Sequence, residues 1–169
     1  MPSLQKKICL LGTFGVGKTS LVRRFVENHF EDKYLSTIGV KVSRKQLAVA
    51  AGTLDLLVWD IANADELGTV EKSYFRGAQG ALVVHDLTRP ESCERLAVYC
   101  RRFLEVAPRA RLVFAGNKLD LIEAPQPSPE EYLQFTAGFS APHFFTSAKT
   151  GAQVEQAFQA LAEAILAAP

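Results

Sequence analysis

Residues 12–19 of the 169-residue chain read Gly12-Thr-Phe-Gly-Val-Gly17-Lys18-Thr19. This stretch fits the pattern G-x-x-x-x-G-K-[ST], whose glycines let backbone N–H groups surround phosphate oxygens. The apolar run Ile8-Cys-Leu-Leu11 precedes it and is typical of a buried strand, and the apolar residues that follow have helical spacing. Strand, loop and helix therefore occur in the order that a phosphate-binding loop requires. We expect Lys18 to reach the β- and γ-phosphates and the Thr19 hydroxyl to bind Mg²⁺.

Composition and charge are those of a globular protein of ordinary size. Hydrophobic residues make up 48% of the chain and charged residues 22%, which suits one domain over residues 1–169. The net charge of +1 gives no electrostatic case for binding nucleic acid or an anionic membrane. Three cysteines without metal-ligand spacing predict reduced thiols in a cytoplasmic protein. The last residues contain no cysteine for prenylation, so we expect no direct membrane anchor, and we expect a monomer.

Short apolar strands alternate with helical patterns along the rest of the chain. Strands are predicted at 41–50 and 54–59, joined by a hairpin, and at 81–84, 112–115 and 144–145, with helices at 67–77, 91–106, 129–137 and 152–167. This alternation predicts an α/β fold with a mostly parallel sheet and helices on both faces. Ligands of such sheets bind beyond the carboxyl ends of the strands, where the phosphate loop lies.

Two later motifs predict which base is bound. They are Asn117-Lys118-Leu-Asp120 and Ser147-Ala148-Lys149, and each directly follows a predicted strand. The Asp120 carboxylate can accept both donors of guanine, the N1–H and the exocyclic amine. Adenine lacks the first donor and presents a donor where guanine has an acceptor, so polar groups would be left unsatisfied. The stem of Lys118 can cover one face of the base, and the Ala148 N–H can meet guanine O6.

With these motifs in this order, the chain resembles the Ras superfamily of small GTPases, most closely its Rab-like branch, over nearly its full length. Phe25 and Tyr34-Leu-Ser-Thr-Ile-Gly-Val40 resemble the first switch, while Trp59-Asp-Ile-Ala and Ser73-Tyr-Phe-Arg-Gly-Ala-Gln-Gly80 frame the second. The resemblance implies a P-loop NTPase fold with a six-stranded sheet, one antiparallel strand and five helices. In lacking a C-terminal cysteine, the chain is similar to the tail-less Ras-like proteins of prokaryotes.

The resemblance also implies roles for individual residues. Thr37 would bind Mg²⁺ and meet the γ-phosphate through its backbone N–H, and Asp60 would hold Mg²⁺ through water. Phe30 would pack edge-on to guanine, and Tyr34 would close over the phosphates. The implied nucleotide contacts are Gly15, Val16, Gly17, Lys18, Thr19, Ser20, Phe30, Tyr34, Thr37, Asn63, Asn117, Lys118, Asp120, Ser147, Ala148 and Lys149; the metal ligands are Thr19, Thr37 and Asp60, and the catalytic residues are Lys18 and Thr37. Effector or regulator proteins would bind residues 30–45 and 60–77.

The second switch departs from the family pattern. It normally reads Asp-x-Ala-Gly-Gln, whereas this chain has Asn63 at the glycine and Ala64 at the catalytic glutamine. A methyl group cannot orient the attacking water, so we expect slow hydrolysis. Asn63 tolerates unusual backbone angles and can keep the N–H contact to the γ-phosphate. Asp65 is an alternative group for positioning water, but its spacing is off by one.

Phe14 is the second departure, at a loop position that is usually glycine or a small residue. Beside the γ-phosphate, its ring would crowd both the catalytic glutamine position and an arginine finger. The alternative is that the ring folds outward onto the switches and changes nothing.

Three functions are compatible with the phosphate loop. The predicted one is a molecular switch that binds GTP and GDP with Mg²⁺ and hydrolyses GTP slowly. A non-hydrolysing GTP-binding interaction module has the same fold and ligand, and only turnover separates the two. An adenine-nucleotide enzyme such as a small kinase is disfavoured by the guanine motifs and by the lack of a lid or acceptor site.

The histidines, His29, His85 and His143, are scattered and show no triad or metal spacing.

Overall fold

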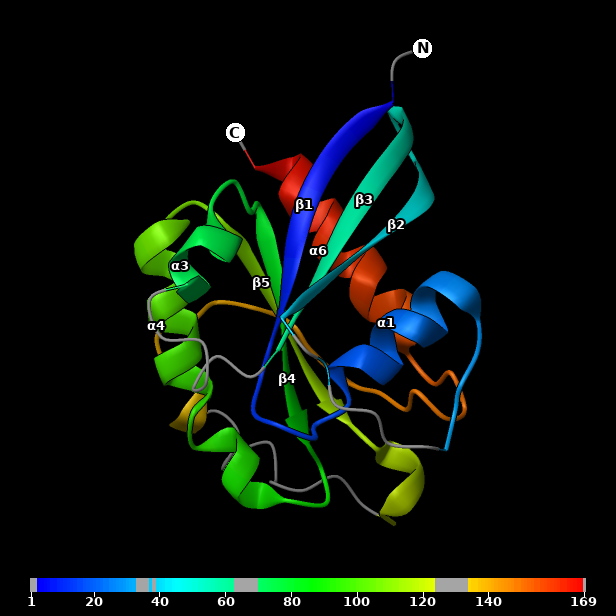
Figure 1. Ribbon diagram of the computed structural model, residues 1–169, viewed down its shortest axis with the longest axis vertical. Helices are drawn as coiled ribbons and strands as arrows, with labels where there is room; N and C mark the ends of the chain where they lie inside the picture. Colours follow the sequence, from blue (N-terminus) through cyan, green and yellow to red (C-terminus); the bar gives the residue numbers. More distant parts are fainter. Residues whose placement is uncertain (1–2, 33–36, 38, 63–69, 124–133, 169) are drawn as a thin grey trace.

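A six-stranded sheet forms the centre of the molecule, in the order β2-β3-β1-β4-β5-β6 (Figure 1). The computed structural model describes residues 3–32, 37, 39–62, 70–123 and 134–168. The strands are β1 (Leu4–Leu11), β2 (Val40–Val49), β3 (Gly52–Ile61), β4 (Gly80–Asp86), β5 (Arg111–Asn117) and β6 (His143–Phe145). Every neighbouring pair is parallel except β2 and β3, which form the predicted hairpin. The predicted strands and the one antiparallel strand are thus confirmed.

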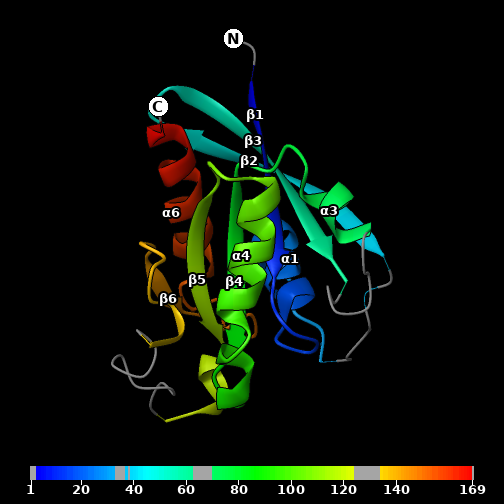
Figure 2. The same ribbon diagram turned by 90° about the vertical axis from the view of Figure 1, so that its left-hand side faces the viewer.

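Helices cover both faces of the sheet, and the strand residues alternate between two cores. The helices are α1 (Lys18–Glu27), α3 (Val70–Phe75), α4 (Leu96–Val106) and α6 (Val154–Ala167), with short 3₁₀ helices η1 (Pro90–Cys93) and η2 (Leu119–Leu121). Helices α1 and α6 lie on one face, and α3 and α4 lie on the other (Figures 1 and 2). Ile8 and Leu10 pack into the first core, whereas Cys9 and Leu11 pack into the second. This period of two is what a strand buried on both faces requires.

Phe25 belongs to the core rather than to the first switch. It is 4% exposed in α1 and stacks on Phe158 of α6, with ring centroids 4.0 Å apart and planes 3° from parallel. The helical spacing of Phe25 with Leu21 and Val22 points all three side chains at the sheet. Its predicted place in the first switch was therefore wrong.

The helix predicted over 91–106 is divided in the structure. The chain forms η1, turns at residues 94–95 and begins α4 only at Leu96. The Ser92 hydroxyl accepts the Asp86 N–H at 2.8 Å and donates to the Arg89 carbonyl at 2.7 Å. Such bonds between a side chain and nearby backbone compete with helical hydrogen bonding, which explains why the helix starts late.

The other predicted helices are found where the structure describes them. The prediction at 67–77 corresponds to α3 and the one at 152–167 to α6. Most of the predicted 129–137 helix lies outside the described residues. None of the helices within the described ranges is both long and apolar enough to cross a bilayer.

Candidate nucleotide-binding site

The phosphate loop connects β1 to α1, and close packing requires glycine at two of its positions. A β-carbon at Gly12 would collide with the Val84 carbonyl, and one at Gly17 would collide with the Asn117 side chain. Gly17 is also the residue just before α1; its φ of 99° is a left-handed conformation, and no side chain caps the helix there. The first N–H groups of α1 therefore remain as donors at the positive end of the helix, which is an anion-binding arrangement.

Lys18 places a cation against the same loop. Its Nζ donates to the carbonyl oxygens of Gly12 at 2.7 Å and of Thr13 at 3.3 Å. The ammonium charge thus adds to the positive end of the helix dipole. Loop, helix end and lysine together form the electropositive cradle that the sequence predicted.

The three side chains expected to bind Mg²⁺ converge. Thr19 Oγ1 lies 2.6 Å from Thr37 Oγ1 and donates to Asp60 Oδ2, also at 2.6 Å. Asp60 lies near the end of β3 and is 1% exposed. Its second oxygen, Oδ1, is buried and has no hydrogen-bond partner among the described residues. A buried carboxylate oxygen beside two hydroxyls is a donor set that a hard divalent cation prefers, so these residues fit Mg²⁺.

Electrostatics at Asp60 point the same way. Burial raises the pKa of its carboxyl, against the Thr19 hydrogen bond and the positive charges of Lys18 and Lys41. A bound cation would offset this desolvation, because it is the largest local charge in such a site.

Asn117 joins the phosphate loop to the base motifs. Its Nδ2 donates to the Val16 carbonyl at 3.0 Å, across 101 positions of the sequence. Its Oδ1 accepts from the Thr146 hydroxyl at 3.2 Å and from the Ala148 N–H at 3.3 Å. The predicted loops, at 12–19, 117–120 and 147–149, therefore lie together at one edge of the sheet, which we call the rim. The contact of Ala148 with guanine O6 stays a prediction.

The carboxylate expected to read guanine is held by a neighbouring hydroxyl. Ser147 Oγ donates to Asp120 Oδ1 at 2.6 Å. The residue before η2, Lys118, has φ of 71°, which is unusual for a residue with a side chain. The turn is secured by the Leu119 N–H, which donates to the Thr146 carbonyl at 3.0 Å. Backbone strain held by surrounding bonds in this way is common at functional sites.

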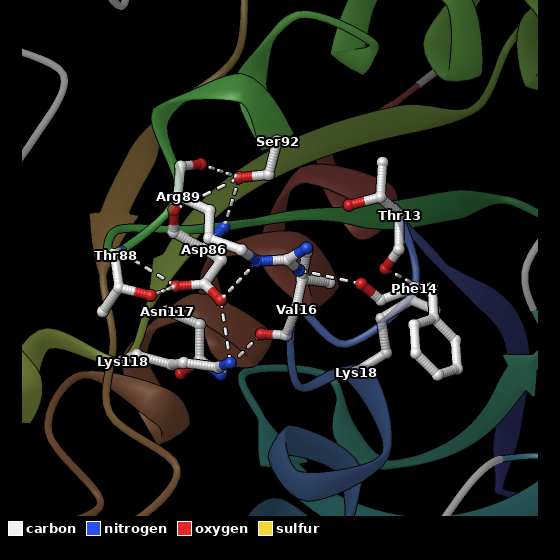
Figure 3. A network of polar contacts seen from close by, with 10 residues as sticks. All are labelled: Thr13, Phe14, Val16, Lys18, Asp86, Thr88, Arg89, Ser92, Asn117 and Lys118. Carbon is white, nitrogen blue, oxygen red and sulfur yellow. Dashed lines mark hydrogen bonds and ion pairs between the residues drawn. The ribbon is translucent and has the colours of Figure 1, made fainter.

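Lys118 also contacts a buried carboxylate that the sequence analysis missed. Its Nζ lies 2.8 Å from Asp86 Oδ2 at the end of β4, where Asp86 is fully buried (Figure 3). Burial alone would raise the pKa of Asp86, but hydrogen bonds from Lys118, Thr88 and Arg89 hold it below its ordinary value. The carboxylate therefore stays charged and fixes the lysine whose stem is expected to cover the base.

Arg24 is a second residue that the sequence did not indicate. From α1 its Nε donates to the Ala148 carbonyl at 2.8 Å, and its Nη2 donates to the Lys149 carbonyl. Its Nη1 donates to Asn28 Oδ1 at 3.1 Å. The guanidinium therefore holds the Ser-Ala-Lys turn against α1. An arginine on an amphipathic helix gives no local signal of such a role.

Several predicted residues cannot be placed. Tyr34, Asn63, Ala64 and Asp65 lie outside the described residues, so their roles stay predictions.

The remaining predicted residues lie on or near the rim. Gly15 lies in the phosphate loop, Ser20 in the first turn of α1, and Lys149 in the turn after β6. Phe30 is partly buried against the core, and its contact with guanine stays a prediction. Phe14 is 50% exposed, and its ring points away from the Asp86 network (Figure 3).

The structure corrects the expectation that the histidines are scattered. His85 of β4 and His143 of β6 stack, with their Nε2 atoms 3.3 Å apart, and Cys93 Sγ lies 3.1 Å from His85 Nδ1. Gly116 of the intervening β5 makes this possible, because a β-carbon there would meet the His85 ring. A contact across two strands leaves no trace in local sequence spacing.

This pair predicts that the protein loses stability in mild acid. Burial, and secondly His143, lower the pKa of His85 to about 3 against the influence of Asp86, and burial lowers the pKa of His143 to about 4. Unfolded histidines titrate near 6.5, so the unfolded chain takes up more protons below that pH. The free energy of unfolding should fall as the pH drops from about 6.5 towards 4, by on the order of 1 kcal/mol per pH unit for each histidine.

Urea denaturation at pH 7, 6 and 5 measures this dependence. His143→Gln should flatten it, whereas the surface substitution His29→Gln is the matched control and should leave it steep. Equal slopes for wild type and His143→Gln would contradict the assignment.

Comparison with known proteins agrees with the family resemblance that the sequence motifs indicate. A model of the Ras family matches residues 7–167. Ras-related protein Rab-21 of Geodia cydonium is 32% identical over 167 residues, which is 98% of this chain and 73% of the relative. Ras-related protein Rab-13 of Canis lupus familiaris is 34% identical over 95% of this chain and 79% of the relative. Ras-related protein RABD2c of Arabidopsis thaliana is 34% identical over 94% and 79%. The family model and these relatives show that the chain belongs to the Ras family of small GTPases, as a Rab-like member.

Proposed function

We propose that this Rab-like chain is a molecular switch that binds GTP and GDP with Mg²⁺ and hydrolyses GTP slowly. The observation that carries the proposal is the pair of hydrogen bonds made by the Asn117 side chain. One goes to Val16 in the phosphate loop and the other to Ala148 in the base motif. One side chain thereby sets the distance between the phosphate cradle and the groups that would read guanine. A nucleotide that spans both is the ligand that this spacing suits.

The chain's own residues supply binding and positioning. The N–H groups of the loop and of the first turn of α1 donate to phosphate oxygens, and Lys18 neutralises their charge. Thr19, Thr37 and Asp60 would hold Mg²⁺, which when bound would neutralise phosphate charge. Asp120, oriented by Ser147, accepts the two donors of guanine.

Slow turnover follows from residues that are missing from the usual set. Ala64 provides no amide to orient water, and phosphoryl transfer depends mostly on positioning and charge stabilisation. Thr37 and Lys18 remain to stabilise charge, so turnover is reduced rather than abolished. The second candidate, a GTP-binding interaction module without turnover, is favoured by the same Ala64.

The nucleotide on the freshly purified protein separates these two functions. We expect GDP, because even slow hydrolysis is complete during expression and purification. Chromatography of the nucleotide released by denaturation identifies it. A protein that carries mainly GTP would contradict the switch and support the non-hydrolysing module.

Effectors or regulators would bind residues 30–45 and 60–77, which include the start of β2 and the end of β3. Val42 on β2 is 48% exposed and offers apolar contact area there. The three cysteines are free and buried, as suits a reducing compartment, and our proposal includes a monomer in the cytoplasm.

A further inference from the structure

Arg89 connects the end of β4 to the backbone of the phosphate loop. Its Nη2 donates to the Phe14 carbonyl at 2.8 Å, and its Nε donates to Asp86 Oδ2 at 3.1 Å (Figure 3). The side chain is 39% exposed, whereas that of Asp86 is fully buried. Asp86 itself is fixed, because its Oδ1 accepts the Thr88 N–H at 2.8 Å and the Thr88 hydroxyl at 2.6 Å. The guanidinium is therefore held on a carboxylate of fixed position, from which it reaches the Phe14 carbonyl.

The geometry of the peptide bond gives this contact a consequence for the ligand. In a trans peptide, the carbonyl of one residue and the N–H of the next point in opposite directions. When Arg89 holds the Phe14 carbonyl, the Gly15 N–H must point to the opposite side of the loop. Gly15 has φ of 78°, so without a side chain this peptide can otherwise turn over at little steric cost.

Asn117 holds the Val16–Gly17 peptide in the same way as Arg89 holds the Phe14–Gly15 peptide. It binds the Val16 carbonyl at 3.0 Å and so directs the Gly17 N–H away from itself. Two carbonyls of the phosphate loop are thus held by side chains outside the loop. Asn117 of the base motif binds the Val16 carbonyl, and Arg89 binds the Phe14 carbonyl. Asp86 couples these two supports, since its Oδ2 is shared by Arg89 and by Lys118 of the base motif.

We propose that Arg89 is a positioning residue that directs the Gly15 N–H at the β-phosphate of the bound nucleotide. The inference rests on the proposed nucleotide binding and adds a residue that none of the sequence motifs includes. The guanidinium acts on the loop backbone through its planar fork, which serves the Phe14 carbonyl and Asp86 at once. A lysine carries the same charge but has no fork.

The test is the rate at which fluorescent GDP leaves the Mg²⁺-bound protein. Arg89→Gln removes the charge-assisted bond and should speed release by roughly tenfold or more. Arg89→Lys should also release GDP faster than wild type, because charge alone does not fix the peptide. Arg109→Gln is the matched control; Arg109 is exposed before β5, at the opposite end of the strand from the site, and its substitution should change nothing.

A ³¹P NMR spectrum of bound GDP distinguishes positioning from a general loss of structure. In Arg89→Gln the β-phosphate signal should move while the α-phosphate signal stays near its wild-type position. Release at the wild-type rate in Arg89→Gln, full rescue by Arg89→Lys, or faster release with an unchanged β-phosphate signal would each overturn the proposal. Failure of wild type and Arg109→Gln to bind GDP at all would instead refute the nucleotide site itself.

Discussion

Replacing Asp120 with asparagine should change the preferred base from guanine to xanthine. The substitution keeps Oδ1 as an acceptor for the Ser147 hydroxyl, which now lies 2.6 Å from it. The new amide group therefore takes the place of the oxygen that faces the base. It would oppose the donors of guanine, whereas it can donate to the additional carbonyl of xanthine. Because polar groups that face each other are then left unsatisfied, GDP affinity should fall by roughly 10⁴-fold.

Displacement of a fluorescent nucleotide by GDP and by XDP measures this exchange. XDP should displace the probe from the variant far better than GDP does, with the reverse order in wild type. Glu105→Gln removes one negative charge in the same way at an exposed position of α4 and is the matched control. Unaltered preference for GDP in Asp120→Asn would show that another group reads the base.

GTP hydrolysis should increase when Phe14 and Ala64, the two residues that depart from the family pattern, are restored together. Wild type should turn over at or below roughly 10⁻⁴ per second, the slow level of small GTPases without an activator. Ala64→Gln returns the amide that orients water. Phe14 belongs to the phosphate loop, however, and its ring is expected to crowd the position of that amide. Phe14→Gly removes that ring, which is half-exposed at the loop surface. The gain of the double variant should exceed the sum of the single gains, because both side chains would share one space.

Single-turnover hydrolysis by the four proteins measures this coupling. An arginine-finger activator should give wild type little of the roughly 10³–10⁵-fold increase that such fingers supply elsewhere, and should give the double variant more. A fast wild type, or a double variant no faster than wild type, would show that this chain positions its water by other means.

The sequence predicted the sheet well because its strands are short apolar runs between clear breakers. It also predicted which loops meet, since the carboxyl ends of parallel strands share one edge. The division of the 91–106 helix could not be predicted, because it depends on the Ser92 hydroxyl reaching the backbone of Asp86 and Arg89. The pattern of apolar residues alone runs through this break.

The supports of the site were invisible for a related reason. Arg24 and Arg89 act on carbonyl oxygens of segments far away in the sequence, and a backbone carbonyl has no sequence signature. The His85–His143 pair likewise depends on Gly116 in the strand between them. Motifs therefore located the groups that would touch the ligand, whereas the groups that hold them required the structure.

Competition for a single fluorescent probe would show whether one rim binds a guanine nucleotide with Mg²⁺. The nucleotide-free protein is loaded with fluorescent GDP in Mg²⁺ and titrated with unlabelled GDP, GTP or ATP. We predict displacement by GDP and GTP at low concentration, little displacement by ATP, and rapid loss of the probe when EDTA removes Mg²⁺. Equal displacement by ATP and GTP, or binding indifferent to EDTA, would show that the rim is not a Mg²⁺-dependent guanine-nucleotide site.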